Sequence, residues 1–209
     1  IMKGALLVNL GSPKSTSTKD VKNYLDEFLM DKRVIDTPYL VRAFEVKGII
    51  LNTRPKKSAK AYKKIWWEEG SPLVAISERF AKKMEGVVDV PVVLGMRYGS
   101  LSIEKALMQL TEQDVEEVLL VPLYPHYAMS STETVIVKTQ DLIRTKFKTL
   151  QLDVMDPFYN KKGYLKVLGK HLKEHLKDFE PDHLLFSYHG IPERHIYKSD
   201  TTGSHCKID

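Results

Sequence analysis

Five short apolar runs, separated by stretches with helical periodicity, constrain the fold of this 209-residue chain more than any other feature. The runs are ALLVNL at 5–10, VPVVLGM at 90–96, VEEVLLVPLY at 115–124, QLDVMDPF at 151–158 and HLLFSY at 183–188. Strands of continuous apolar character that alternate with helices are typical of parallel sheets covered on both faces. The sequence therefore predicts a doubly wound α/β fold.

Three of the intervening stretches have the apolar spacing of amphipathic helices. Val21, Leu25, Phe28 and Leu29 follow Ser17 and Asp20; Ile103, Ala106, Leu107 and Leu110 follow Ser102; and Leu165, Leu168, Leu172 and Leu176 form the third set. A serine just before such a pattern is typical of a helix start, because its hydroxyl accepts a hydrogen bond from a free backbone amide. We expect helices at all three places.

The order strand, helix, strand recurs from about Val115 onwards. We therefore expect two similar doubly wound parallel-sheet domains, 1–114 and 115–209, the second of them incomplete. The apolar helical stretch 38–53, PYLVRAFEVKGIILNT, lies outside the alternation. It would serve either as core or as a lip over a pocket.

Several classes of protein are disfavoured by composition and motif. A single cysteine, Cys206, forms no intrachain disulfide and no C-x-x-C pair, which favours a reducing compartment and makes the cytoplasm the default location. No stretch approaches the roughly 18 apolar residues of a membrane span, and the start of the chain lacks a signal-peptide layout. The turn NLGSP matches neither of the glycine motifs of nucleotide-binding proteins, G-x-G-x-x-G and G-x-x-x-x-G-K-[ST]. The net charge of +5 is spread along helices without the aromatic residues of a nucleic-acid motif, so we expect no nucleic-acid partner.

Polar and aromatic side chains gather where three of the predicted strands end. Arg97 and Tyr98 lie in GMRYGS, Tyr124 begins YPHYAMSS, and His189 follows the apolar run in LLFSYHGIPERH. The carboxyl ends of parallel strands meet at one edge of a sheet, where ligands bind. A cleft there would offer a cation for a carboxylate, aromatic faces for a flat apolar molecule and an imidazole for metal or proton chemistry. The alternatives are a local ion pair for Arg97, rim packing for the tyrosines and a strand cap for His189.

Five motifs, in order and at suitable separations, resemble the ferrochelatase family over nearly the whole chain. They are LLVNLGSP, GSPL, GMRYGS, VPLYPHYAMSSTET and LLFSYHGIPERH. The resemblance implies a chelatase-like α/β fold and a lyase that inserts ferrous iron into a porphyrin in haem biosynthesis. It implies Fe2+ as the substrate metal and no organic cofactor.

The resemblance also assigns residues. The family's catalytic and metal-handling histidine falls on His189, and the lip falls on 38–53. The residues that would contact the porphyrin are Leu10, Arg54, Tyr62, Arg97, Tyr98, Tyr124 and Ser130. His126 stands where many members carry glutamine, and we assign it no role.

One departure from the family concerns length. Ferrochelatases run about half as long again and supply an acidic residue opposite the histidine from their later part. The resemblance therefore implies that this chain is the N-terminal portion and is inactive alone. Some bacterial members bind an iron-sulfur cluster through cysteines in this neighbourhood, but one cysteine, Cys206, does not support a cluster here.

Two other functions fit the sequence. A two-lobed small-ligand binding protein would share the sheet topology but would not need His189, and a cobalt chelatase would act on another tetrapyrrole. The lip is compatible with peripheral contact with the inner face of the membrane. The choice between protoporphyrin and coproporphyrin, and the oligomeric state, are not readable from the sequence.

Overall fold

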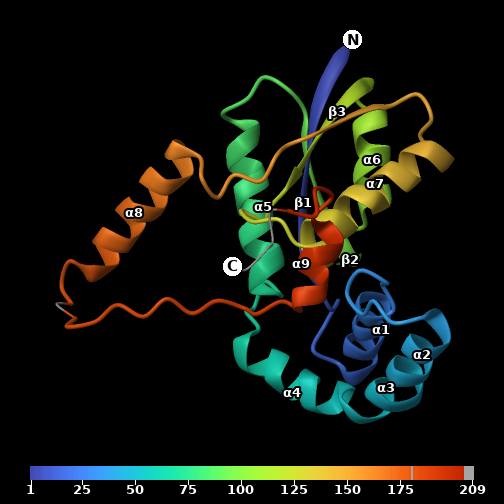
Figure 1. The fold of residues 1–209 in the computed structure, drawn as a ribbon. Helices are drawn as coiled ribbons and strands as arrows, with labels where there is room; N and C mark the ends of the chain where they lie inside the picture. The colour runs from blue at the N-terminus through green and yellow to red at the C-terminus, as the bar shows by residue number, and fades with distance from the viewer. Residues whose placement is uncertain (180, 205–209) are drawn as a thin grey trace.

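A computed structural model describes residues 1–179 and 181–204 and places four parallel strands in one sheet with helices on both faces (Figure 1). The strands are β1 (Met2–Ser12), β2 (Val92–Gly99), β3 (Val115–Pro122) and β4 (Gln151–Val154), in the order β2-β1-β3-β4. The predicted α/β fold class is confirmed, and four of the five predicted strands form.

The two faces of the sheet are buried by different helices because side chains alternate along a strand. Leu6 and Val8 of β1 belong to the larger apolar cluster, which contains residues of α6 (Ile103–Thr111) and α7 (Thr134–Thr145). Leu7 belongs to a smaller cluster with Ala81 of α5 (Pro72–Glu85). This double coverage explains the uninterrupted apolar character of β1.

Serine caps begin two of the predicted helices. Ser17 accepts a hydrogen bond from the amide of Asp20 (3.1 Å) at the start of α1 (Thr18–Leu29). Ser102 accepts one from the amide of Lys105 (3.3 Å) at the start of α6. The third predicted helix is α8 (Lys162–Leu176), which has no buried residue.

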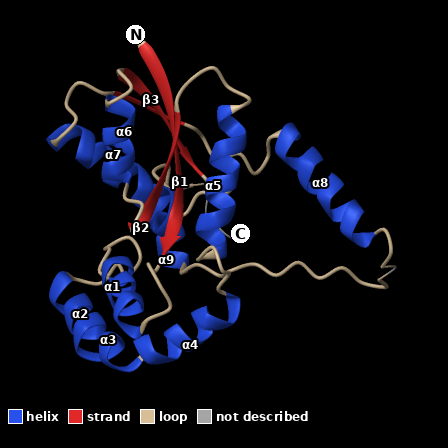
Figure 2. Ribbon diagram, turned by 180° about the vertical axis from the view of Figure 1, so that it is seen from behind, coloured by secondary structure: helices blue, strands red, loops and turns tan. Residues whose placement is uncertain are grey.

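A layer of helices lies at the carboxyl ends of β1 and β2, where the strand arrows point (Figure 2). After α1 come α2 (Tyr39–Ala43), the π-helix η1 (Phe44–Ile50), α3 (Leu51–Thr53) and α4 (Pro55–Ile65). The lip therefore consists of α2, η1 and α3. This layer covers the sheet edge at which ligands bind in open parallel sheets.

The prediction of a fifth buried strand at 183–188 is wrong. Residues 181–192 form no helix or strand, and Leu185 is 91% exposed. The segment runs between α8 and α9 (Glu193–Ser199), away from the sheet (Figures 1 and 2). A buried strand needs a partner backbone and a covering layer. The helix α8 does not pack over β4, so the apolar run at 183–188 is not returned to the sheet. It therefore has no partner strand and no covering helix.

The sheet continues across the expected domain boundary. β3 lies beyond position 114 but pairs with β1 over Met2–Val8. The described residues form no second sheet, and the division into units 1–114 and 115–209 stays a prediction. No helix in the described ranges is long and apolar enough to cross a bilayer.

Candidate functional site at the strand ends

Arg97 and Tyr98, at the end of β2, share one carboxylate. Arg97 Nη2 lies 2.6 Å from Asp31 Oδ2, and the Tyr98 hydroxyl donates to the same oxygen at 3.0 Å. Thr134 also donates to it, and Arg97 Nε donates to Thr134 Oγ1 at 2.8 Å. The Asp31 side chain is 7% exposed and that of Arg97 is 13% exposed. The local ion pair that the sequence left open for Arg97 is therefore present.

This network keeps Asp31 ionised. Burial alone would raise the pKa of Asp31, but the hydrogen bonds from Thr134 and from the Arg33 backbone amide, with the charge of Arg97, hold its pKa below the usual value. Burial raises the pKa of Tyr98, so its phenol stays protonated and acts as a donor. The end of β2 thus presents an arginine whose charge is largely balanced within the protein.

Four aromatic rings form a wall beside this network. Phe28 packs edge-on against Tyr98 with 5.1 Å between ring centroids and stacks on Tyr24 at 6.0 Å. Tyr24 contacts the ring of Tyr62 at 6.5 Å, so the wall extends from β2 through α1 to α4. Tyr98 and Tyr24 are 1% and 6% exposed, so the rings that can meet a large planar ligand directly are those of Phe28 and Tyr62.

Gly11 allows β1 and β2 to approach closely at this end of the sheet. Its φ is +99°, and an added Cβ would lie 1.8 Å from the carbonyl oxygen of Tyr98. The carbonyl of Gly11 accepts a hydrogen bond from the Tyr24 hydroxyl at 3.3 Å. The glycine in NLGSP therefore serves strand packing and the aromatic wall.

Leu10, Tyr124 and Ser130 also lie at or just after the ends of strands. Leu10 is half-buried near the end of β1, and Tyr124 is two residues past the end of β3. The Tyr124 hydroxyl is buried and has no hydrogen-bond partner among the described residues; burial raises its pKa. Ser130 lies in the π-helix η2 (Met129–Glu133). Short π-helices are frequent at functional sites.

The two remaining residues that were predicted to contact the porphyrin, Tyr62 and Arg54, differ in their exposure to solvent. Tyr62 is half-buried in the aromatic wall, whereas Arg54 is exposed at the junction of α3 and α4. The structure thus brings Tyr62 towards Tyr98 through Tyr24 and Phe28. It leaves the guanidinium of Arg54 in solvent.

The predicted position of His189 at a sheet edge is wrong, because the strand that would carry it does not form. Its side chain is exposed, and Nδ1 lies 2.5 Å from the carbonyl oxygen of Gly190. Within 1–179 and 181–204, no hydrogen bond or ring contact joins it to Arg97, Tyr98 or Tyr124, and no group of three or more metal-ligating side chains forms. Its role in catalysis and metal binding stays a prediction. Cys206 lies outside the described residues.

Sequence reasoning missed three acidic residues that hold this end of the molecule together. Glu133 accepts from Arg33 Nε at 3.0 Å and from the Tyr127 hydroxyl at 3.0 Å. Asp31 and Asp36 lie with Arg33 in the segment MDKRVIDTP that links α1 to the lip. In the sequence, Asp31 and Asp36 stand out only as aspartates beside apolar residues. This pattern does not reveal the distant basic residues with which they pair.

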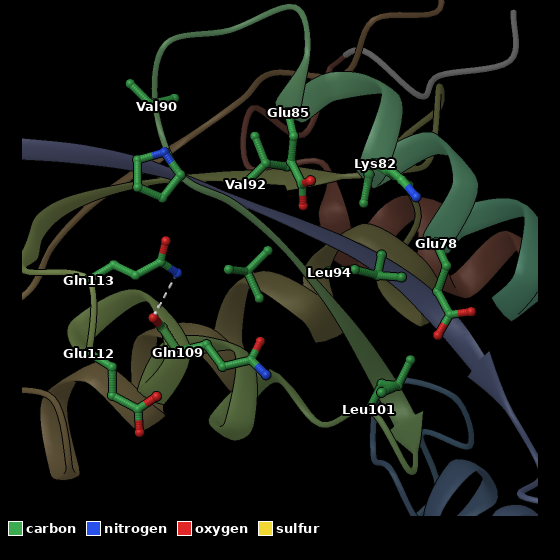
Figure 3. A pocket seen from close by; sticks show the side chains of 13 residues that line it. Glu78, Lys82, Glu85, Val90, Val92, Leu94, Leu101, Gln109, Glu112 and Gln113 are labelled. Carbon is green, nitrogen blue, oxygen red and sulfur yellow. Dashed lines mark hydrogen bonds between the residues drawn. The ribbon is translucent and has the colours of Figure 1, made fainter.

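A groove of about 650 Å3 lies beside β2 (Figure 3). It is lined by Glu78, Lys82 and Glu85 of α5 and by Val92 and Leu94 of β2, with α6 on the other side. None of the predicted site residues lines it. It is therefore separate from the network at the strand ends.

A second cavity, of about 500 Å3, brings the HGIPERH segment against η2. Its lining includes Tyr127, Met129, Tyr159, Ile191 and Ile196. Ile191 follows His189 by two residues, and Met129 precedes Ser130. Two of the sequence motifs thus meet here.

Comparison with known proteins agrees with the motifs. The family model described as Ferrochelatase matches residues 2–207. A ferrochelatase of Pseudomonas savastanoi pv. phaseolicola is 49% identical over 206 residues, which cover 98% of this chain and 60% of that relative. A ferrochelatase of Azotobacter vinelandii is 48% identical over 202 residues, covering 96% of this chain and 59% of the relative. This chain spans about 60% of the length of these relatives, and it belongs to the ferrochelatase family.

Proposed function

We propose that this chain is the N-terminal portion of an enzyme that inserts ferrous iron into a porphyrin to form haem. The observation that carries the proposal is the family match across residues 2–207, with relatives 49% identical along nearly the whole chain. Such an enzyme is a lyase of haem biosynthesis. Its substrates would be Fe2+ and a porphyrin, and its chemistry needs no organic cofactor.

The porphyrin would lie against the aromatic wall at the carboxyl ends of the strands. Tyr62 would contact the ring, with Leu10 at the end of β1 and Tyr124 and Ser130 beyond β3, and Tyr98, which is 1% exposed, would support Phe28 from behind. Arg97 would attract a propionate, although its ion pair with Asp31, at 2.6 Å, lowers the charge that it offers. Arg54, which is exposed, would reach a propionate from the lip side.

Metal insertion needs a base, because two pyrrole protons must leave as a divalent metal enters. A flat macrocycle shields its nitrogens, so the pocket walls must bend the ring. Neutral imidazole, with a pKa of about 6.5, accepts a proton or donates a lone pair to a metal at neutral pH. His189 would do one of these two tasks.

One imidazole is too few protein ligands to hold and direct Fe2+, which prefers nitrogen and oxygen donors together. We therefore propose that residues beyond this chain share the task and that residues 1–209 alone insert little or no iron. One cysteine, Cys206, gives no support for an iron-sulfur cluster.

The lip would admit the porphyrin and contact the membrane that dissolves it. Tyr39, Leu40 and Phe44 are 63%, 80% and 68% exposed and lie within six consecutive positions, so the lip carries a cluster of exposed apolar side chains. We propose a cytoplasmic enzyme that touches the inner face of the membrane through this surface.

Porphyrin binding and metal insertion test the proposal together. Quenching of protoporphyrin fluorescence by this chain should saturate, and a protein with the full length of the relatives should convert porphyrin and Zn2+ or Fe2+ into metalloporphyrin. Absence of insertion by the longer protein would overturn the proposed enzyme. Binding without insertion would instead indicate a binding protein.

A further inference from the structure

Asp36 is a buried carboxylate surrounded by three basic side chains from one short helix. Lys198 Nζ lies 2.5 Å from Oδ2, Arg194 Nε lies 2.8 Å from Oδ1, and His195 Nε2 lies 3.4 Å from Oδ1. The Asp36 side chain is 6% exposed. All three partners come from α9 (Glu193–Ser199), which is 157 or more positions away in the sequence.

The contacts with Asp36 orient α9 as well as attract it. Residues three or four apart lie on the same face of a helix, so Arg194 and Lys198 point towards the same carboxylate. His195 is 3% exposed, which places this face of α9 against the segment that carries Asp36. A helix of seven residues is unstable by itself and depends on such tertiary contacts.

The position of α9 limits where His189 can lie. Glu193, the first residue of α9, follows His189 by four positions. An extended chain spans at most about 3.6 Å per residue, so the Cα atom of His189 stays within roughly 14 Å of the Cα atom of Glu193. Residues 181–192 form no helix or strand, so α9 is the nearest ordered element to His189 in the chain.

The segment that carries Asp36 is held from its other side by the base of the lip. Arg42 of α2 donates from Nη1 to the carbonyl oxygens of Ile35 (3.1 Å) and Thr37 (2.6 Å). Arg42 is 7% exposed. Arg42 of the lip thus holds the backbone on both sides of Asp36.

We infer that Asp36 is a positioning residue that anchors α9 to the base of the lip and so sets the place of His189 in metal insertion. The side-chain partners of the Asp36 carboxylate among the described residues are Arg194, His195 and Lys198, none of them a predicted porphyrin contact, so Asp36 acts through α9. The functional half of this inference rests on the proposed function. Its structural half, the anchoring of α9, does not.

Spin labels test the anchoring directly. In a Cys206→Ser background, Tyr197→Cys on α9 and Met108→Cys on α6 provide two exposed labelling sites, because Tyr197 is 55% exposed and Met108 is 47% exposed. The distance distribution between them should be narrow in the parent and about twofold broader with Asp36→Asn, because α9 loses its charged anchor. Asp36→Glu, which keeps the charge, should restore a narrow distribution.

Two further variants distinguish anchoring from a general loss of structure. Arg194→Gln with Lys198→Gln removes the partners from the exposed side of α9 and should broaden the distribution as Asp36→Asn does. Asp141→Asn breaks an exposed ion pair with Arg144 and should leave the distance distribution between the spin labels narrow. An unchanged width with both Asp36→Asn and the α9 double variant would overturn the inference.

Turnover tests the link to His189. In a protein with the full length of the relatives, Asp36→Asn should lower kcat for Zn2+ insertion about tenfold and change KM for porphyrin less than about twofold, since it misplaces a reacting group without touching the ring. Equal kcat with a broadened distance distribution would overturn the link to His189. If the unsubstituted full-length protein inserts no metal, the proposed function fails, and the spin-label distances still decide whether Asp36 anchors α9.

Discussion

Asp31 and Arg97 form an ion pair in the interior of the strand-end layer, with 2.6 Å between Asp31 Oδ2 and Arg97 Nη2. The two residues come from the turn after α1 and from the end of β2. Thr134, at the start of α7, donates to the same carboxylate oxygen. One carboxylate therefore joins three elements, two of which, β2 and α7, are also linked by the hydrogen bond from Arg97 Nε to Thr134 Oγ1.

Removing the charge of Asp31 should destabilise the fold. Asp31→Asn leaves the guanidinium of Arg97 buried without a counter-charge, so we expect the free energy of unfolding in urea to fall by about 3 kcal/mol. Asp141→Asn, which breaks an exposed pair, should change it by less than about 0.5 kcal/mol. Equal effects of the two substitutions would show that the buried pair contributes no more than a surface pair.

Stability should fall in acid because of two carboxylates. Hydrogen bonds from Lys198 and Arg194 outweigh the opposing effect of burial and hold the pKa of Asp36 far below its usual value. The pKa of Asp31 is also lowered. A lowered folded-state pKa gives stability that is present above the unfolded value of about 3.9 and is lost as the pH falls through the folded-state pKa. Thermal melts between about pH 5 and pH 2 should show this loss, and Asp31→Asn with Asp36→Asn should flatten it. A parent curve no steeper than that of the double variant would contradict the assignment.

Arg97 should contribute to porphyrin affinity. Arg97→Leu should raise the Kd about fivefold or more, because a partly buried charged contact contributes about 1 kcal/mol or more. Arg97→Leu also leaves Asp31 unpaired, so the decisive comparison is Arg97→Leu with Asp31→Asn. Weak binding by the double variant supports a direct contact, whereas recovery of parent affinity would mean that Arg97 acts only by neutralising Asp31.

The sequence predicted those parts of the fold that depend on local pattern. Apolar runs predicted β1 to β4, because strands buried on both faces need apolar residues on both sides of the sheet. The four residues of β4, QLDV, alternate instead between exposed and half-buried positions. The same rule failed at 183–188, where an apolar run has no partner strand and no covering helix. The pairing of Asp31 with Arg97 was also out of reach, because it joins residues 66 positions apart and no periodicity relates them.

The exposed apolar surface of the lip should drive membrane association. Leu40→Asp or Phe44→Asp should weaken binding to anionic phospholipid vesicles about tenfold, since each removes an apolar group that would enter the interface. Stability should change by less than about 0.5 kcal/mol, because both side chains are exposed. Ile76→Asp is the matched control, since Ile76 is 53% exposed on α5. Equal loss of vesicle binding with Ile76→Asp would contradict a specific role for the lip.

We propose that His189 performs metal insertion together with residues that this chain does not contain. The most direct measurement compares the rate of Zn2+ or Fe2+ insertion into a porphyrin by three proteins: this chain, a protein with the full length of the relatives, and that longer protein with His189→Ala. We predict rapid insertion by the longer protein and a loss of at least about a hundredfold both in this chain and in the histidine variant. Rapid insertion by this chain, or by the histidine variant, would contradict the account.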